Sequence, residues 1–133
     1  MIFIDTGAFI ARYIRNDQYH HKSIEVWKRL EQGRGVLFTS NFIIDETLTL
    51  LGRRVGYIFA AERARSIYAS QILTILRPSE DQECQAVDLF EKYADQRVSF
   101  TDCVSFMLMQ HQHITEVFSF DRHFEMAGFS LLS

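Results

Sequence analysis

The sequence is poor in proline, in cysteine and in net charge. Its 133 residues include one proline and two cysteines, and the formal net charge at pH 7 is -3. A hydrophobic content of 47% with a single proline excludes a disordered or low-complexity chain. The length suits one hydrophobic core and no linker is visible, so we expect a single domain over residues 1–133.

Long apolar runs and clustered cysteines are absent as well. No stretch reaches the length of a membrane-spanning helix, and the first residues lack the basic and apolar regions of a secretory signal. Cys84 and Cys103 stand apart without CxxC spacing, so we expect two buried free thiols. These absences favour a cytoplasmic protein without membrane association.

Hydrophobic periodicity predicts strands that alternate with helices. The predicted strands are residues 2–4, 36–38, 71–76, 116–120 and 129–132. Helices are predicted over residues 8–14, 17–33, 42–51, 57–69, 102–112 and 121–127, with another after Ser79. The predicted packing residues of the helices over 57–69 and after Ser79 are Ala60, Ala64, Ile67, Tyr68, Val87, Phe90 and Tyr93. Such alternation is typical of a parallel sheet with right-handed crossovers.

Asp5 lies where the first predicted strand leaves the sheet. Residues 2–4 are apolar without alternation, which indicates a strand buried on both faces, as at the centre of a parallel sheet. Ligands of open α/β sheets bind beyond the carboxyl ends of the strands. We therefore expect the Asp5 carboxylate at a binding crevice.

A second acid, Glu46, is predicted to point inward. On the helix over residues 42–51 it shares a face with Phe42 and Leu50, whereas Asp45 lies with Thr49 on the polar face. The alternative is a glutamate at the rim of the apolar face whose carboxylate reaches water.

Asp102 and Asp121 also stand beside apolar segments. Asp102 opens the most apolar predicted helix, and Asp121 follows an apolar strand as Asp5 does. All three aspartates have an alternative role as helix N-caps. In a parallel sheet, however, the two strand ends open on the same edge, where the helix starts that carry Glu46 and Asp102 also lie.

Four carboxylates at one edge need a compensating charge. Two unit charges about 4 Å apart near a protein surface repel by about 4 kcal/mol. Protonation or a divalent cation relieves this repulsion, and carboxylate oxygens suit Mg²⁺ or Mn²⁺. The sequence therefore predicts a site for one or two hard metal ions.

Four segments resemble the motifs of the PIN-domain ribonucleases, especially the VapC-type toxins of bacterial toxin–antitoxin pairs. They are IFIDTGA (2–8), NFIIDETLTLL (41–51), SFTDC (99–103) and VFSFDRHF (117–124). The resemblance spans essentially the whole chain and assigns the family's acids to Asp5, Glu46, Asp102 and Asp121. Ser119 stands where the family usually has threonine, and His123 stands where many members have another acid.

The resemblance implies a fold and a function. The expected fold is a Rossmann-like α/β three-layer sandwich with a five-stranded parallel sheet. The expected activity is that of a Mg²⁺- or Mn²⁺-dependent endoribonuclease, which forms a homodimer and is inhibited by a VapB-type antitoxin. Glu46 or Asp5 is expected to orient or deprotonate the attacking water, and Thr6 and Ser119 to orient carboxylates. As an alternative, both hydroxyls belong to simple turns.

RNA contact needs a local basic patch, because a net charge of -3 offers no global attraction for a polyanion. Arg12 and Arg15 follow the first strand, and Arg122 flanks Asp121, so these three are the predicted RNA contacts. A second basic group comprises Arg53, Arg54, Arg63 and Arg65. The apolar segment over residues 57–68 is either a partner-binding surface or part of the core.

Two other functions compete with the nuclease. One is an inactive module of the same fold that binds protein or RNA, although the presence of all four acids argues against it. The other comes from Asp5-Thr6-Gly7, which resembles the triplet of aspartic proteases. Those enzymes are all-β and need a second triplet, whereas this chain has mostly helical periodicity and one triplet.

Overall fold

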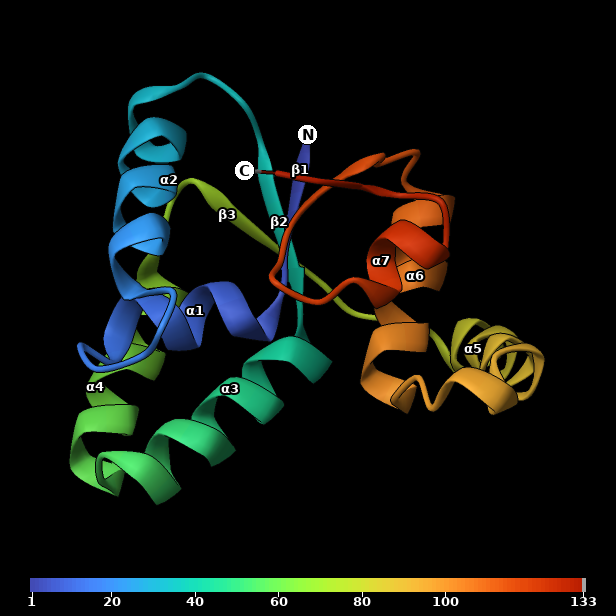
Figure 1. Cartoon of the computed structure of the whole chain (residues 1–133), viewed down its shortest axis with the longest axis horizontal. Coiled ribbons are helices and arrows are strands. Elements are labelled where there is room, and N and C mark those ends of the chain that lie inside the picture. Colours follow the sequence, from blue (N-terminus) through green and yellow to red (C-terminus); the bar gives the residue numbers. More distant parts are fainter. Residues whose placement is uncertain (133) are drawn as a thin grey trace.

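The computed structural model describes residues 1–132 and contains a five-stranded sheet (Figure 1). The strands are β1 (Ile2–Ile4), β2 (Leu37–Ser40), β3 (Leu73–Leu76), β4 (Glu116–Phe118) and β5 (Ser130–Leu131). They lie in the order β3-β2-β1-β4-β5, and every neighbouring pair is parallel. The predicted α/β fold with a five-stranded parallel sheet is confirmed.

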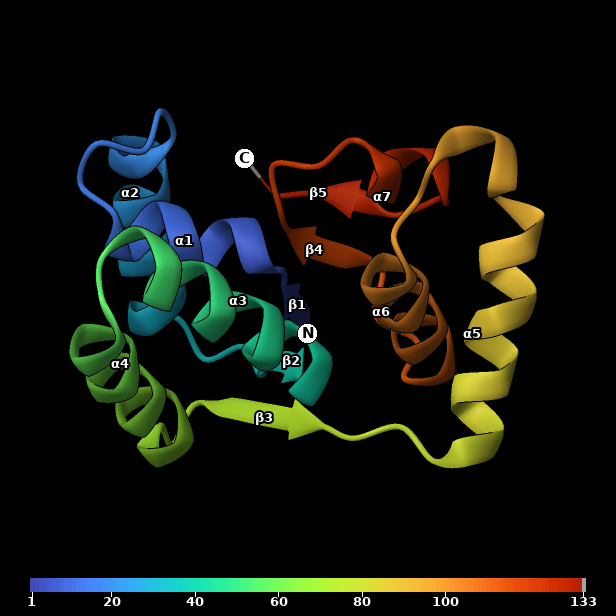
Figure 2. The same ribbon diagram turned by 90° about the horizontal axis from the view of Figure 1, so that it is seen from below.

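Helices cover both faces of the sheet and make three layers (Figure 1 and Figure 2). One layer holds α1 (Thr6–Tyr13), α2 (His20–Gln32), α3 (Asn41–Arg54) and α4 (Tyr57–Ala69). The other holds α5 (Glu80–Lys92), the short 3-10 helix η1 (Ala94–Gln96), α6 (Phe100–His111) and α7 (His123–Met126). Within residues 1–132 no helix is both long and apolar enough to span a bilayer.

β1 is the central strand, and the direction in which successive strands are added to the sheet reverses at it. From β1 the chain continues to β2 and β3 on one side, and it later returns to β4 and β5 on the other. Ile4 of β1 is paired with Phe118 of β4, so the residues that follow these two strands leave the sheet side by side. Such a switch point opens a crevice beyond the carboxyl ends of the strands. Asp5 and Ser119 both lie at this crevice.

Aromatic packing on both faces of the sheet surrounds β1 and β4. On one face the Trp27 ring lies 5.4 Å from the Phe9 ring and 5.6 Å from the Phe118 ring, between centroids. On the other face Phe106 of α6 packs against Phe124 of α7 at 5.0 Å. Phe3 of β1 is completely buried, as predicted for a central strand. This packing fixes the positions from which the acidic residues emerge.

The starts of α1, α2, α6 and α7 differ from the predicted ones by two or three residues, whereas those of α3, α4 and α5 agree to within one. α1 begins at Thr6, which puts Asp5 in the N-cap position. α6 begins at Phe100, and its N-cap is Ser99, whose Oγ accepts a hydrogen bond from the Asp102 backbone N–H at 3.1 Å. The alternative role of Asp102 as the N-cap of this helix is therefore wrong. Apolar periodicity marks the buried face of a helix and leaves its capping residue undefined.

Four side chains that were predicted to be buried are exposed. Val87, Phe90 and Tyr68 are 51%, 47% and 54% exposed, and Cys84 is exposed as well. α5 is an outer helix that packs against α6, and only Ala86 among its residues is buried. Periodicity predicts which side of a helix faces inward, but the width of the covered stripe depends on the neighbouring helix.

Candidate metal centre at the carboxyl edge of the sheet

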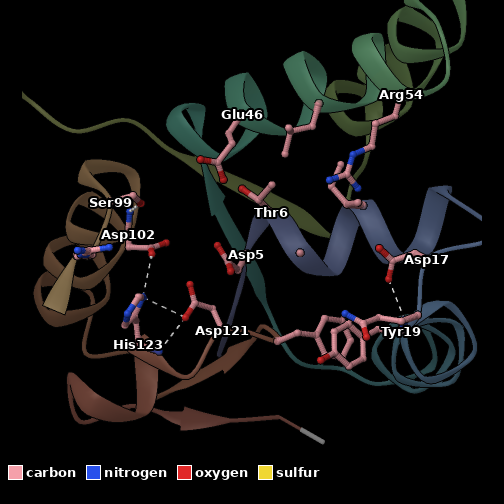
Figure 3. Close-up of a pocket in the computed structure, with 16 residues that line it drawn as sticks. Asp5, Thr6, Asp17, Tyr19, Glu46, Arg54, Ser99, Asp102, Asp121 and His123 are labelled. Atoms are coloured by element: carbon pink, nitrogen blue, oxygen red, sulfur yellow. Dashed lines mark hydrogen bonds and ion pairs between the residues drawn. The ribbon is translucent and has the colours of Figure 1, made fainter.

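A cavity of about 490 Å³ opens at the carboxyl edge of the sheet (Figure 3). The acids predicted from the sequence all line it, and they are Asp5, Glu46, Asp102 and Asp121. They come from the end of β1, from α3, from α6 and from the segment after β4. The fold therefore gathers carboxylates from distant parts of the chain into one space.

The Asp5 carboxylate is buried and held by a hydroxyl group. Asp5 is 5% exposed, and its side chain makes no capping hydrogen bond to α1, so the alternative role as a helix cap is wrong. Ser119 Oγ donates a hydrogen bond of 2.7 Å to Asp5 Oδ2. Burial raises the pKa of Asp5 from 3.8 to about 6, although the Ser119 hydrogen bond lowers it, and the charges of Glu46 and Asp121 add to the rise.

Ser119 connects two of the acids. Its Oγ donates to Asp5 and accepts a hydrogen bond of 3.0 Å from the Asp121 backbone N–H. Ser119 is 3% exposed, so water has little access to either bond. The Thr6 hydroxyl differs, because its Oγ1 is buried and has no hydrogen-bond partner among the described residues. The predicted contact of Thr6 with a carboxylate is therefore absent, and its side chain faces the cavity instead (Figure 3).

Asp102 projects from the first turn of α6 into the same cavity. Burial raises the pKa of Asp102 well above its ordinary value of 3.8, and the negative charges of Asp5, Asp121 and Glu46 raise it further. The charges of the four carboxylates therefore act on one another across the cavity.

Asp121 and His123 form another side of the cluster. Asp121 Oδ1 accepts a hydrogen bond of 2.9 Å from the His123 backbone N–H, which closes a short turn before α7. His123 Nδ1 lies 3.2 Å from Asp121 Oδ1 and 3.9 Å from Asp102 Oδ2 (Figure 3). One ligand atom from each of Asp102, Asp121 and His123 lies within 4.8 Å of the others. This spacing can hold a metal ion.

Glu46 points from α3 into the cavity, on the side opposite Asp121 (Figure 3). It is half-buried, whereas the adjacent Asp45 is exposed, so the predicted inward and outward faces of this helix are confirmed. Leu50, one turn further along α3, lines the same cavity.

The four carboxylates of the cavity form no ion pair with an arginine or lysine of the described chain. In the described part of the chain, no arginine or lysine lies within 4.0 Å of these four carboxylates, and His123 is the basic group that does. The donors are carboxylate oxygens with one imidazole nitrogen that makes no hydrogen bond. Such a donor set fits a divalent cation such as Mg²⁺ or Mn²⁺.

Known proteins resemble this chain in both sequence and fold. The model of the PIN domain family matches residues 2–130. The 23S rRNA-specific endonuclease VapC20 of Mycobacterium tuberculosis is 33% identical over 129 residues, which cover 97% of this chain and 95% of that protein. This chain belongs to the VapC-type ribonucleases of the PIN-domain family.

Further relatives of this PIN domain agree with the assignment. A VapC ribonuclease of Archaeoglobus fulgidus is 29% identical over 125 residues, which cover 92% of this chain and 78% of that protein. The crystal structure of Mycobacterium tuberculosis VapC20, described as a Sarcin-Ricin loop cleaving toxin, matches with a TM-score of 0.89 and 31% identity over 97% of this chain and 96% of that one. FitAcB from Neisseria gonorrhoeae matches with a TM-score of 0.71 and 13% identity over 100% and 97% of the two chains, which shows the fold alone.

Several residues of the PIN-domain cavity had no role at this site in the sequence-based prediction. The Tyr19 ring stacks on the Phe120 ring, with centroids 4.3 Å apart and planes 3° from parallel, and both residues line the cavity. Arg54 and Arg97 line it too, and Arg97 has a left-handed backbone with φ of 55°. Arg54 was predicted only as part of a second basic group. Arg97 lies in an irregular segment, where periodicity gives no signal. Tyr19 lies just before α2, although the predicted helix over residues 17–33 included it, so the predicted start of that helix is wrong.

None of the three predicted RNA contacts lines the acidic cavity of the PIN domain. Arg12 forms an ion pair of 2.7 Å with Glu31 in a second cavity. Arg15 and Arg122 are exposed, and neither lines the acidic cavity. Their contacts with RNA stay predictions.

Proposed function

We propose that this protein is a metal-dependent endoribonuclease and the toxin of a VapBC-type toxin–antitoxin pair. The supporting observation is the convergence of Asp5, Glu46, Asp102 and Asp121 in one cavity, where no arginine or lysine among the described residues pairs with them. Membership of the PIN-domain family supports cleavage of RNA, because the VapC relatives are described as an endonuclease specific for RNA and as a ribonuclease.

The proposed ligands of one or two Mg²⁺ or Mn²⁺ ions are the four acids, directly or through water. A divalent ion bound there supplies an activated water and neutralises the charge that develops on the phosphate. Ser119 holds the Asp5 carboxylate at a fixed place relative to the Asp121 backbone. Glu46 is less buried than Asp5, and in this proposal it orients the attacking water or accepts its proton.

RNA is proposed to approach over the rim of the acidic cavity. Arg54 and Arg97 line this cavity and supply positive charge for phosphates near the cleaved bond. The stacked rings of Tyr19 and Phe120 offer an aromatic surface beside the acids, and Tyr19 is 40% exposed. Unpaired bases of RNA stack on such surfaces. We therefore propose a single-stranded or looped segment as the cleaved region, with Arg15 and Arg122 as outer contacts.

Substrate and partners are proposed by analogy with the relatives. VapC20 is described as specific for 23S rRNA, so ribosomal RNA is the first substrate to test. A VapB-type antitoxin, a homodimer and a cytoplasmic location are proposed from the VapC-type family. Tyr57 and Ile58 at the start of α4 are 75% and 82% exposed, and they support a protein interface at that place.

Cleavage of ribosomal RNA by the purified protein tests the proposal. We expect cleavage with Mg²⁺ or Mn²⁺, loss of cleavage with a chelator, and recovery when excess metal is restored. Asp5→Asn should lower the rate about a thousandfold, because it removes a charge that the ion requires. Asp88→Asn is the matched control, because Asp88 is an exposed aspartate on α5, and it should leave the rate unchanged.

Two results would contradict the nuclease proposal. Cleavage that survives both the chelator and Asp5→Asn would come from a contaminant or from another site. Binding of RNA without cleavage under either metal would favour the inactive binding module.

A further inference from the structure

The candidate ligand atoms around Asp102 and Asp121 include one nitrogen. His123 Nδ1 is buried, yet no hydrogen bond of acceptable geometry joins it to any group among the described residues. Asp121 Oδ1 is only 3.2 Å away, but it lies in the wrong direction for a hydrogen bond with the imidazole. A buried polar atom without a partner is unfavourable in a folded protein unless a ligand completes its environment.

The spacing of the three atoms fits shared ligation of an ion. Ligands about 2.1 Å from an octahedral ion lie about 3 Å apart when adjacent and about 4.2 Å apart when opposite. Nδ1 lies 3.2 Å from the Asp121 oxygen and 3.9 Å from the Asp102 oxygen, within this range. No two candidate ligand atoms in the group are more than 4.8 Å apart.

The position of the ring leaves Nδ1 free to act as a ligand. The His123 side chain is 35% exposed although Nδ1 is buried, so solvent reaches the other edge of the ring. A neutral imidazole can carry its hydrogen on Nε2 toward water and present the lone pair of Nδ1 to an ion. The His123 backbone N–H is bonded to Asp121 Oδ1, and this bond holds the histidine beside the cluster.

We propose that His123 Nδ1 is a direct ligand of the divalent ion and that it shifts the preference of the site from Mg²⁺ toward Mn²⁺. This inference rests on the proposed metal-dependent nuclease and specifies its metal selectivity. Mg²⁺ is held almost entirely by oxygen, whereas first-row transition ions accept imidazole nitrogen. An acid at position 123 would give an all-oxygen set, so the histidine distinguishes this site from one built of carboxylates alone.

Pulsed electron paramagnetic resonance of the full-length protein loaded with Mn²⁺ tests the ligand directly. Electron spin echo modulation from a coordinated ¹⁴N nucleus is expected in the wild-type protein. The modulation should disappear in His123→Asp and in His123→Asn, both of which offer oxygen in place of nitrogen. His21→Asp makes the same chemical change at an exposed position on α2, outside the cavity, and should keep the modulation.

Calorimetric titration with each metal alone gives the selectivity. The ratio of the Mg²⁺ to the Mn²⁺ dissociation constant should fall by about tenfold or more in His123→Asp and stay at the wild-type value in His21→Asp. Thermal unfolding of each variant checks that it is folded. If both His123 variants fail to fold, the wild-type spectrum still decides, because absence of nitrogen modulation overturns the inference.

Asp5→Asn in the same titration separates the two proposals. If Asp5→Asn weakens metal binding and RNA cleavage while the wild type shows no nitrogen modulation, the His123 inference fails and the nuclease proposal stands. If His123 variants change neither the spectrum nor the ratio, the His123 inference also fails. If Asp5→Asn alters neither metal binding nor cleavage, or the wild type binds neither ion, the proposed metal site fails.

Discussion

Two cavities of nearly equal volume differ in how their charges are balanced. The acidic cavity measures about 490 Å³, and a second one of about 520 Å³ lies between α1, α2 and α4. In the second, Arg12 pairs with Glu31 at 2.7 Å, and its guanidinium carbon lies 4.6 Å from the centre of the Trp27 ring. The carboxylates of the first have no arginine or lysine partner in the described chain. The absence of an arginine or lysine ion-pair partner for its acids, rather than its volume, therefore distinguishes the candidate metal centre from the second cavity.

The largest effect is expected from a matched pair of substitutions on α3. Glu46→Gln should lower kcat/KM for RNA about a thousandfold, because the amide can neither accept a proton nor balance an ion. Asp45→Asn should leave kcat/KM within about twofold, because Asp45 is exposed and does not line the cavity. Single-turnover cleavage measures both. Equal effects of the two substitutions would remove Glu46 from the proposed site.

The next largest effect is expected on the free energy of unfolding of the metal-free protein. The pKa of Asp5 is about 6 in the folded protein against 3.8 ordinarily, so the folded state binds this proton more tightly than the unfolded state. That contribution to stability is fully present below about pH 4 and is lost as pH rises through about 6. It amounts to as much as about 3 kcal/mol. Urea unfolding in chelator at pH 4 and pH 7 should show this loss.

Asp5→Asn provides the control for the pH dependence. The amide does not titrate, so the loss of unfolding free energy between pH 4 and pH 7 should become smaller. If the pH dependence of the unfolding free energy is unchanged in Asp5→Asn, the Asp5 carboxyl is not the group that causes it. The contrast in electrostatics between the two cavities would then be weaker.

A smaller effect is expected in the second cavity. Arg12→Ala should lower the free energy of unfolding by about 1–2 kcal/mol, because a partly exposed ion pair and a cation–π contact are lost. Urea denaturation measures this change. RNA cleavage per folded molecule should change by less than about threefold. A tenfold loss of cleavage at unchanged stability would instead support the sequence-based prediction that Arg12 contacts RNA.

The smallest effect is expected at the rim of the acidic cavity. Arg54→Ala should raise KM about three- to tenfold with little change in kcat, because one phosphate contact is lost. Arg53→Ala is the matched control, because Arg53 is an exposed neighbour that does not line the cavity. Kinetics over a salt series should show a weaker salt dependence for Arg54→Ala alone. Identical behaviour of the two variants would place the RNA path elsewhere.

The positions of the acids could be predicted because each depends on a regular element. Asp5 and Asp121 follow buried strands whose ends coincide in a parallel sheet, and Glu46 follows from the periodicity of one helix. Asp102 was predicted to reach the same edge, although its helix begins two residues earlier with Ser99 as the cap.

The remainder of the cavity depends on features without periodicity. Tyr19 is held by a loop in which Asp17 Oδ1 accepts a hydrogen bond from its backbone N–H, and Arg97 by a left-handed turn. The exposure of Val87 and Phe90 depends on how α5 docks on α6, which is a tertiary effect. Local sequence patterns carry no information about such contacts.

The double hydrogen bond of Ser119 has a thermodynamic consequence. One hydroxyl group links the side chain that follows β1 to the main chain that follows β4. Much of the rotational freedom of these groups is therefore lost when the protein folds, before any ion arrives. Replacing Ser119 by alanine would transfer that loss to the binding step, so an ion would associate more weakly even though every coordinating atom is still present.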